Sequence, residues 1–197
     1  MKFLTYKYKE SGIGEFVDFW SLFYDEGRYS DEVYGKNLNR KGLLNERNIK
    51  PLWEWKNGGP LSKSKQPVIL RTVEKLDEIN SFRKLLRVSK RDVRESSYIV
   101  PCGFVWKVFL FHIARPDDYP IFDQHVARAY HFLTTGEIHV EPELNMRRYY
   151  QYIKFFKMIK KKGNKDERQV DRALMAFGQH LKRYKKPIEI MLGRIER

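Results

Sequence analysis

The sequence predicts a compact all-α protein, and three observations support this. Apolar residues recur at three- and four-residue intervals along most of the chain, which is the spacing of a helix face. Acidic residues and glycines stand where those patterns begin and end. The alternation of strands and helices that a parallel sheet requires is absent. With 197 residues, 42% of them hydrophobic, the chain can bury a substantial core.

The first half of the chain predicts four helices. The apolar spacing indicates a helix over residues 15–23, a short helix from Ser30 and a third helix over 45–55. The cluster Asn57-Gly58-Gly59-Pro60 predicts a turn after the third helix. One long helix is expected over 68–86, with these apolar residues on one face: Ile69, Val73, Leu76, Ile79 and Phe82.

The second half predicts four more helices. Residues 104–114 are apolar nearly all round, which is typical of a helix at the centre of a fold. A Pro-rich loop over 115–120 separates this helix from the next, which runs to Gly136. Two helices over 146–163 and 166–181 close the pattern. One domain over residues 1–197 is the default, and two small helical lobes are the alternative, with residues 146–197 in the second.

Positive charge is concentrated in the C-terminal quarter. Residues 146–197 contain 16 Lys and Arg against 5 Asp and Glu, which is +11 of the formal net charge of +14. Such a segment attracts polyanions, and nucleic acid, most of all double-stranded DNA, is the expected partner rather than a membrane. Five residues are candidates for phosphate contacts, although a solvated helix face would have the same composition: Arg147, Lys154, Lys161, Lys182 and Arg183.

Several classes of protein are excluded by composition. Cys102 is the only cysteine, so the chain has no intrachain disulfide and no Cys cluster for iron–sulfur or structural zinc. No stretch has the ~18 apolar residues of a membrane span, and no secretory signal is apparent, so an intracellular protein is expected. His112, His139 and His180 lack metal-ligand spacing in the sequence, and no metal or cofactor is expected.

Lys107 is the first candidate for chemistry. It lies about one turn into the most apolar predicted helix, beside Trp106 and Val108. Burial favours a neutral amine, which is the form that attacks a sugar C1′. The alternative is a lysine whose stem lies along apolar surface while its head stays in water.

Asp123 is the second candidate. It follows Pro120-Ile121-Phe122 and precedes a helix-forming segment, so it is placed as a helix N-cap. A carboxylate held there could also stabilise a developing oxocarbenium ion. A cap alone and a catalytic cap are both compatible with this position.

The order of these two residues resembles the helix-hairpin-helix DNA glycosylase superfamily. In that family a hairpin of pattern Leu-Pro-x-x-Gly-x-Lys precedes a Val-Asp-x-His-Val-x-Arg segment by less than twenty residues. Here the segment Asp123-Gln124-His125-Val126-Ala127-Arg128 is similar to the second pattern, and Lys107 lies 16 residues before Asp123. The resemblance covers about thirty residues of the chain.

The resemblance implies a helical glycosylase-like fold and a base-excision N-glycosylase, with abasic-site lyase activity as a further implication. Lys107 would be the amine nucleophile, Asp123 the essential carboxylate, and His125 and Arg128 supporting positions. Gly103 would belong to the hairpin whose backbone N–H groups bind a phosphate.

The hairpin departs from the family pattern. It reads Val100-Pro101-Cys102-Gly103-Phe104-Val105-Trp106-Lys107. The spacing from proline to lysine is one residue longer than in the family pattern, and only one glycine survives. This departure supports an alternative function, a non-catalytic nucleic-acid-binding module that keeps the helical scaffold.

Two tryptophans are candidates for a base pocket. Trp53 and Trp55 precede the Asn57-Gly58-Gly59 loop, and aromatic rings are the platforms on which extruded bases stack. Ordinary core packing followed by a turn is the alternative.

Overall fold

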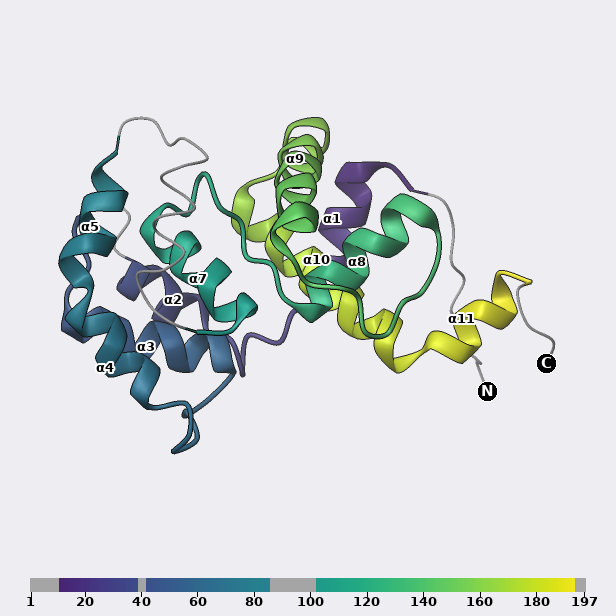
Figure 1. Cartoon of the computed structure of the whole chain (residues 1–197). Helices are drawn as coiled ribbons and strands as arrows, with labels where there is room; N and C mark the ends of the chain where they lie inside the picture. Colours follow the sequence, from purple (N-terminus) through teal and green to yellow (C-terminus); the bar gives the residue numbers. More distant parts are fainter. Residues whose placement is uncertain (1–10, 39–41, 86–101, 194–197) are drawn as a thin grey trace.

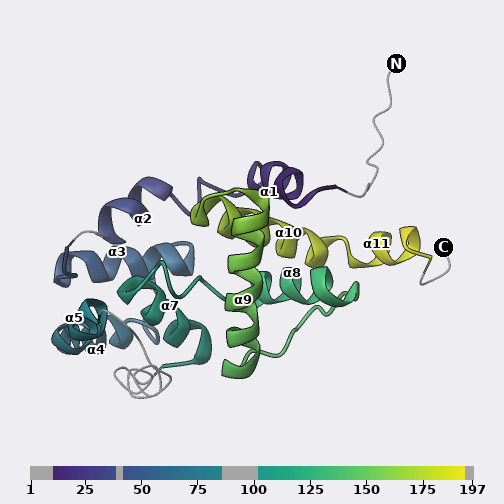
Figure 2. The same cartoon turned by 90° about the horizontal axis from the view of Figure 1, so that it is seen from above.

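The computed structural model describes residues 11–38, 42–85 and 102–193, and this part of the chain contains ten helices and no strand. The predicted all-α fold class is therefore confirmed. Figure 1 shows the helices in two groups, and the same grouping is visible from above in Figure 2. None of the described helices combines the length and the apolar composition that crossing a bilayer requires.

The first group is called here the α3 lobe. It consists of α2 (Asp31–Leu38), α3 (Glu46–Asn57), α4 (Pro67–Glu74), α5 (Leu76–Lys84) and α7 (Phe104–Ala114). Within it α2 and α4 pack on α3, and α5 packs on α7. The helix α7 is buried from Val108 to Ala114, as its all-round apolar sequence predicts.

The second group is called here the α10 lobe. It consists of α1 (Ile13–Ser21), α8 (Gln124–Thr135), α9 (Met146–Gly163), α10 (Glu167–Arg183) and α11 (Lys185–Met191). The helix α10 is central, because it packs on α1, α8, α9 and α11. The helix α1 thus lies in the α10 lobe, the helices from α2 to α7 form the α3 lobe, and the chain crosses back to the α10 lobe between α7 and α8 (Figure 1).

Turn chemistry predicted most helix ends correctly. Gly58 follows α3 and Gly136 follows α8, both in the left-handed conformation with φ of 71° and 76°. Glycine adopts this conformation without the steric cost that a Cβ brings. After α9 the left-handed position is Asn164, one residue beyond the predicted Gly163.

One predicted helix is wrong in its length. Residues 68–86 were expected to form a single helix, but the chain leaves the helical conformation at Lys75, with φ −109° and ψ 18°. The two halves pack on different neighbours, α4 on α3 and α5 on α7. A straight helix could not reach both, so tertiary packing overrides the continuous apolar pattern. The short α11 was not predicted at all.

Candidate functional site at the junction of the two lobes

The loop that leads from α7 to α8 holds Asp123 in a fixed place. Ile121 and Phe122 are buried, and the Tyr149 hydroxyl of α9 donates to the carbonyl of Pro120 at 3.0 Å. A ring nitrogen of His112 lies 2.8 Å from the carbonyl oxygen of Tyr119. Both lobes therefore anchor the residues just before Asp123.

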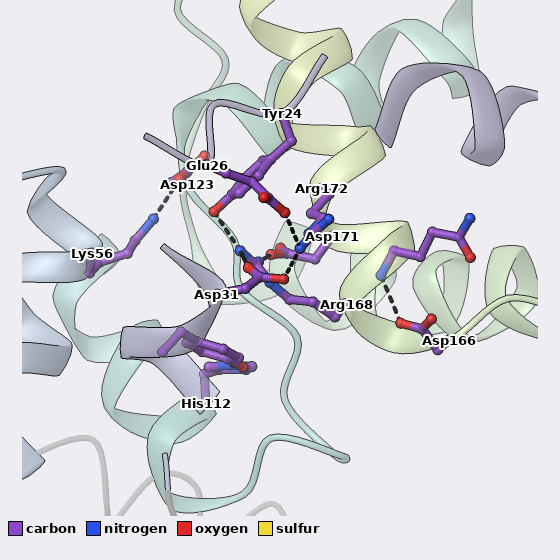
Figure 3. A network of polar contacts seen from close by, with 12 residues as sticks. Tyr24, Glu26, Asp31, Lys56, His112, Asp123, Asp166, Arg168, Asp171 and Arg172 are labelled. Atoms are coloured by element: carbon purple, nitrogen blue, oxygen red, sulfur yellow. Dashed lines mark hydrogen bonds and ion pairs between the residues drawn. The ribbon is translucent and has the colours of Figure 1, made fainter. Parts of the chain in front are cut away.

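Asp123 is the N-cap of α8, as its position in the sequence predicted. Its Oδ1 accepts hydrogen bonds from the backbone N–H groups of His125 at 2.9 Å and Val126 at 3.1 Å. Its Oδ2 accepts from the ammonium of Lys56 at 2.5 Å. Lys56 comes from the last turn of α3, so this contact joins the two lobes (Figure 3).

Burial and charge act in opposite directions on the Asp123 carboxyl. Burial alone would raise its pKa, but the charge and hydrogen bond of Lys56 lower the pKa to about 2. The side chains of Lys56 and Asp123 are only 8% and 10% exposed. The site therefore holds an ionised carboxylate and a cation in contact, largely shielded from water.

A pocket of about 350 Å³ opens beside this pair. Both lobes line it: Tyr29, Lys56 and Trp106 come from the side of the α3 lobe, and Asp123 and His125 come from α8. Its volume lies within the range of small-molecule sites, roughly 300–1,000 Å³. The carboxylate, the amine and an aromatic ring thus share one cavity.

The pocket wall combines an aromatic face with further polar groups. The Trp106 ring packs on Trp53, with 4.8 Å between ring centroids, and the Lys65 ammonium lies 5.8 Å from the Trp106 ring. Burial lowers the pKa of His125, and although Asp123 raises it, the cations Arg128, Lys56 and Lys182 lower it further. A neutral imidazole is therefore the favoured form of His125.

Lys107 does not line this pocket, although its neighbours Val105 and Trp106 do. The amine in contact with Asp123 belongs to Lys56, which the sequence did not single out. The only signal in the sequence was its position just before the Asn57-Gly58-Gly59 turn. The catalytic role of Lys107 stays a prediction from the family resemblance.

The two tryptophans of the predicted base pocket lie in the core of the α3 lobe. Trp53 is 0% and Trp55 is 6% exposed, and neither lines the pocket at Asp123. Trp55 packs against Tyr34 and Phe109 within this core. Trp53 lies behind the pocket wall, where its ring packs against the Trp106 ring.

The remaining predicted residues lie at helix ends and on exposed faces. Gly103 is the exposed N-cap of α7, and a side chain there would meet no atom of the described chain within 4 Å. Val100 and Pro101, which begin the hairpin motif, lie outside the described residues. The five basic candidates are all exposed on α9 and at the end of α10: Arg147, Lys154, Lys161, Lys182 and Arg183.

Arg128 has a structural role, as expected for a supporting position. Its guanidinium is buried and donates to the carbonyls of Val140 and Gly178, the latter at 2.9 Å. It also lies 3.2 Å from Nδ1 of His125. Arg128 thereby fixes α8 against α10 directly behind the pocket.

A second polar network joins the lobes next to the Lys56–Asp123 pair (Figure 3). Arg168 of α10 donates to Asp31 of α2 at 2.8 Å, pairs with Asp171, and lies 4.7 Å from the Tyr24 ring. Burial raises the pKa of Asp171 to about 6 despite the opposing charges of Arg168 and Lys56. This network was not predicted, because its members are spread over 148 residues of sequence, from Tyr24 to Asp171.

Comparisons of this chain with family models, with curated proteins and with solved structures found no match in any of the three.

Proposed function

We propose that the protein binds DNA and cleaves the N-glycosidic bond of a base that enters the pocket at Asp123. The observation that carries this proposal is the ionised Asp123 carboxylate, 2.5 Å from the Lys56 ammonium, at the wall of a pocket that both lobes line. The resemblance of the segment 123–128 to the glycosylase motif and the basic surface of α9 and α10 support it further.

Asp123 would stabilise the positive charge that develops on the sugar. When the C1′–N bond breaks, the base leaves with the bonding electrons and takes up a proton, and the sugar becomes an oxocarbenium ion. A preformed carboxylate in a site shielded from water stabilises that cation without reorganisation. Water or an amine then adds to C1′ and completes the release of the base.

Two amines are candidates for a covalent step. Lys56 is a candidate nucleophile because its amine contacts Asp123. Lys107 is a candidate because it occupies the lysine position of the glycosylase motif. Either amine must first lose a proton, after which its nitrogen adds to the C1′ aldehyde of an opened abasic sugar and water leaves to give a Schiff base.

The basic side chains would contact the DNA backbone. Arg147, Lys154 and Lys161 recur every seven residues on α9, which places them along one stripe of that helix. Lys182 lies close enough to His125 to lower its pKa, so positive charge extends from α10 toward the pocket. The exposed N-terminus of α7 at Gly103 offers backbone N–H groups to a phosphate.

The test measures base release from duplexes that carry single damaged or modified bases, with the wild-type chain and with Asp123→Asn. Asparagine keeps the cap but removes the charge, so base release should fall by roughly 100-fold or more. Asp166→Asn is the matched control, because Asp166 is also a helix N-cap, on α10, and is exposed. Equal activity in wild type and Asp123→Asn would overturn the proposal.

Borohydride trapping on an abasic duplex separates the two amines. Lys56→Gln should abolish the covalent adduct if Lys56 is the nucleophile, and Lys107→Gln should abolish it if the motif assigns the role correctly. Base release without any adduct in the wild type would make the enzyme monofunctional, with water as the nucleophile.

The alternative is a DNA-binding module without catalysis. One observation favours it: both carboxylate oxygens of Asp123 already accept hydrogen bonds, from Lys56 and from two backbone N–H groups. These bonds are what a purely structural helix cap would make. Such a module would bind duplex DNA with steep salt dependence and release no base from any substrate. Asp123→Asn would then alter stability and leave DNA affinity unchanged.

A further inference from the structure

A cluster of three metal-ligand side chains lies at the end of α8, away from the pocket at Asp123. His131 belongs to the last turns of α8, and Glu137 and His139 follow in the connection to α9. One ligand atom from each of the three lies within 4.8 Å of the others. The two imidazole rings are 4.3 Å apart between centroids, and His139 Nε2 is 3.7 Å from a Glu137 carboxylate oxygen.

The chain around the cluster is held by several independent contacts. Ile138, between the two later ligands, is 6% exposed. The backbone N–H of Glu137 donates to the Thr135 hydroxyl at 3.1 Å, and Arg128 donates to the carbonyl of Val140 at 2.9 Å. The segment that bears Glu137 and His139 is therefore fixed against α8 on both sides of the cluster.

His131 has an unsatisfied nitrogen in this place. Its side chain is 9% exposed, and its Nε2 is buried with no hydrogen-bond partner among the described residues. A buried polar atom without a partner is destabilising, and a bound ligand would remove that cost.

We propose that His131, Glu137 and His139 bind a divalent cation of the Zn²⁺ class. Two imidazole nitrogens and one carboxylate oxygen form a donor set that suits Zn²⁺, with the fourth position left to water. Zn–N bonds of ~2.0–2.1 Å at tetrahedral angles place two ligand atoms about 3.4 Å apart, which is shorter than the 4.8 Å within which the three atoms now lie. Glu137 and His139, whose side chains are 66% and 56% exposed, can close that gap by rotation.

The bound cation would fasten the α8–α9 connection to the last turn of α8. His131 lies eight residues after Asp123, or ~12 Å along the helix axis, so this site is separate from the pocket of the proposed function. The nearby charge of Arg148 opposes a cation, but Arg148 is itself 3.7 Å from the Glu143 carboxylate, which offsets it. Metal-ligand spacing around His139 was not recognised in the sequence, because His131 and His139 become neighbours only in the folded chain.

The test is calorimetric titration of the full chain, prepared without a histidine tag, with Zn²⁺ alone. One Zn²⁺ per chain is expected, and Co²⁺ should give the intense visible bands of four-coordinate geometry. Loss of a residue that only hydrogen-bonds to a metal ligand already lowers metal affinity by roughly 10–100-fold. Loss of a ligand itself, in Glu137→Gln or His139→Gln, should therefore lower the affinity for Zn²⁺ at least tenfold. Both residues are exposed, so these variants should fold.

Two control variants make the test specific. Glu141→Gln removes a neighbouring exposed carboxylate, and His180→Gln removes a histidine of α10, and both should bind Zn²⁺ as the wild type does. Absence of binding in the wild type would overturn the proposal. So would equal affinities for wild type, Glu137→Gln and His139→Gln. None of these outcomes depends on glycosylase activity.

Discussion

At the residue scale, the pair of Lys56 and Asp123 illustrates how a buried charge is tolerated. Removing two charges from water is costly, and the mutual attraction offsets that cost only when the remaining hydrogen-bonding capacity is also satisfied. Two backbone N–H groups at the start of α8 provide this for Asp123, and the positive end of the helix adds to it. The same features keep the carboxylate ionised for the chemistry proposed here.

The first prediction concerns the loss of one partner. Lys56→Met leaves the Asp123 carboxylate buried without a cation, so the free energy of unfolding should fall by roughly 3–5 kcal/mol. The double variant Lys56→Met, Asp123→Asn removes both charges and keeps the cap, so it should recover most of that loss. Urea denaturation of the single and double variants measures both values. The pairing would be contradicted if the double variant lost as much unfolding free energy as the two single variants lose together.

The second prediction concerns pH. The pKa of Asp171 is raised by burial to about 6 in the folded chain, from an unfolded value near 3.8. The folded state therefore binds the proton more tightly, and this contribution to stability is present at low pH and is lost as pH rises from about 4 to 6. Asp171→Asn mimics the protonated form. The difference in unfolding free energy between variant and wild type should therefore grow in favour of the variant over that window.

Urea denaturation of both proteins at pH 4 and pH 7 measures this change. Asp166→Asn, the same substitution at the exposed N-cap of α10, is the matched control. An Asp171→Asn variant that loses stability relative to wild type as pH rises would show that the pairing with Arg168 outweighs the burial of the carboxyl.

At the element scale, the position of α8 depends on a close approach to α10. A Cβ built on Gly178 of α10 would lie 1.9 Å from the carbonyl oxygen of His125. The backbones of the two helices therefore pack without an intervening side chain at this point. His125 lies two residues after Asp123 and lines the pocket, so this contact also fixes the backbone of one pocket residue.

The third prediction follows from this contact. Gly178→Ala must separate α8 from α10, so the free energy of unfolding should fall by about 3 kcal/mol or more. Gly35→Ala is the matched control, because Gly35 is an exposed residue of α2 and a Cβ there meets nothing within 4 Å. That substitution should stabilise the chain by roughly 0.5–1 kcal/mol. Thermal unfolding of both variants tests the contrast.

At the scale of the whole molecule, charge and lobe arrangement set the expected mode of binding. The formal net charge is +14, and most of it lies in residues that form α9 to α11 and the end of the chain. Neutralising phosphates releases counterions, so the proposed binding to DNA should weaken steeply as the salt concentration rises. Where on the surface the cations lie decides whether they act on DNA or only keep the protein soluble.

The fourth prediction separates these effects. The triple variant Arg147→Glu, Lys154→Glu, Lys161→Glu should weaken duplex binding strongly, and it should reduce the slope of log K against log salt by about 3. A second triple variant, Lys36→Glu, Lys50→Glu, Lys75→Glu, changes the net charge equally at exposed positions of the α3 lobe and its α4–α5 junction. Equal losses in the two variants, measured by fluorescence anisotropy, would rule out a contact surface on α9.

The order of residues along the chain was enough to predict the fold class, most helix ends and the capping role of Asp123. These depend on apolar spacing, glycine conformation and cap chemistry, which act over a few residues along the chain. Three contacts arise only when the chain folds: Lys56 with Asp123, Arg168 with Asp31 and Asp171, and His131 with His139. The interruption of the helix at Lys75 likewise depends on the packing of its two halves. Each of these depends on which surfaces face each other after folding, and a pattern along one segment carries no information about the segment packed against it.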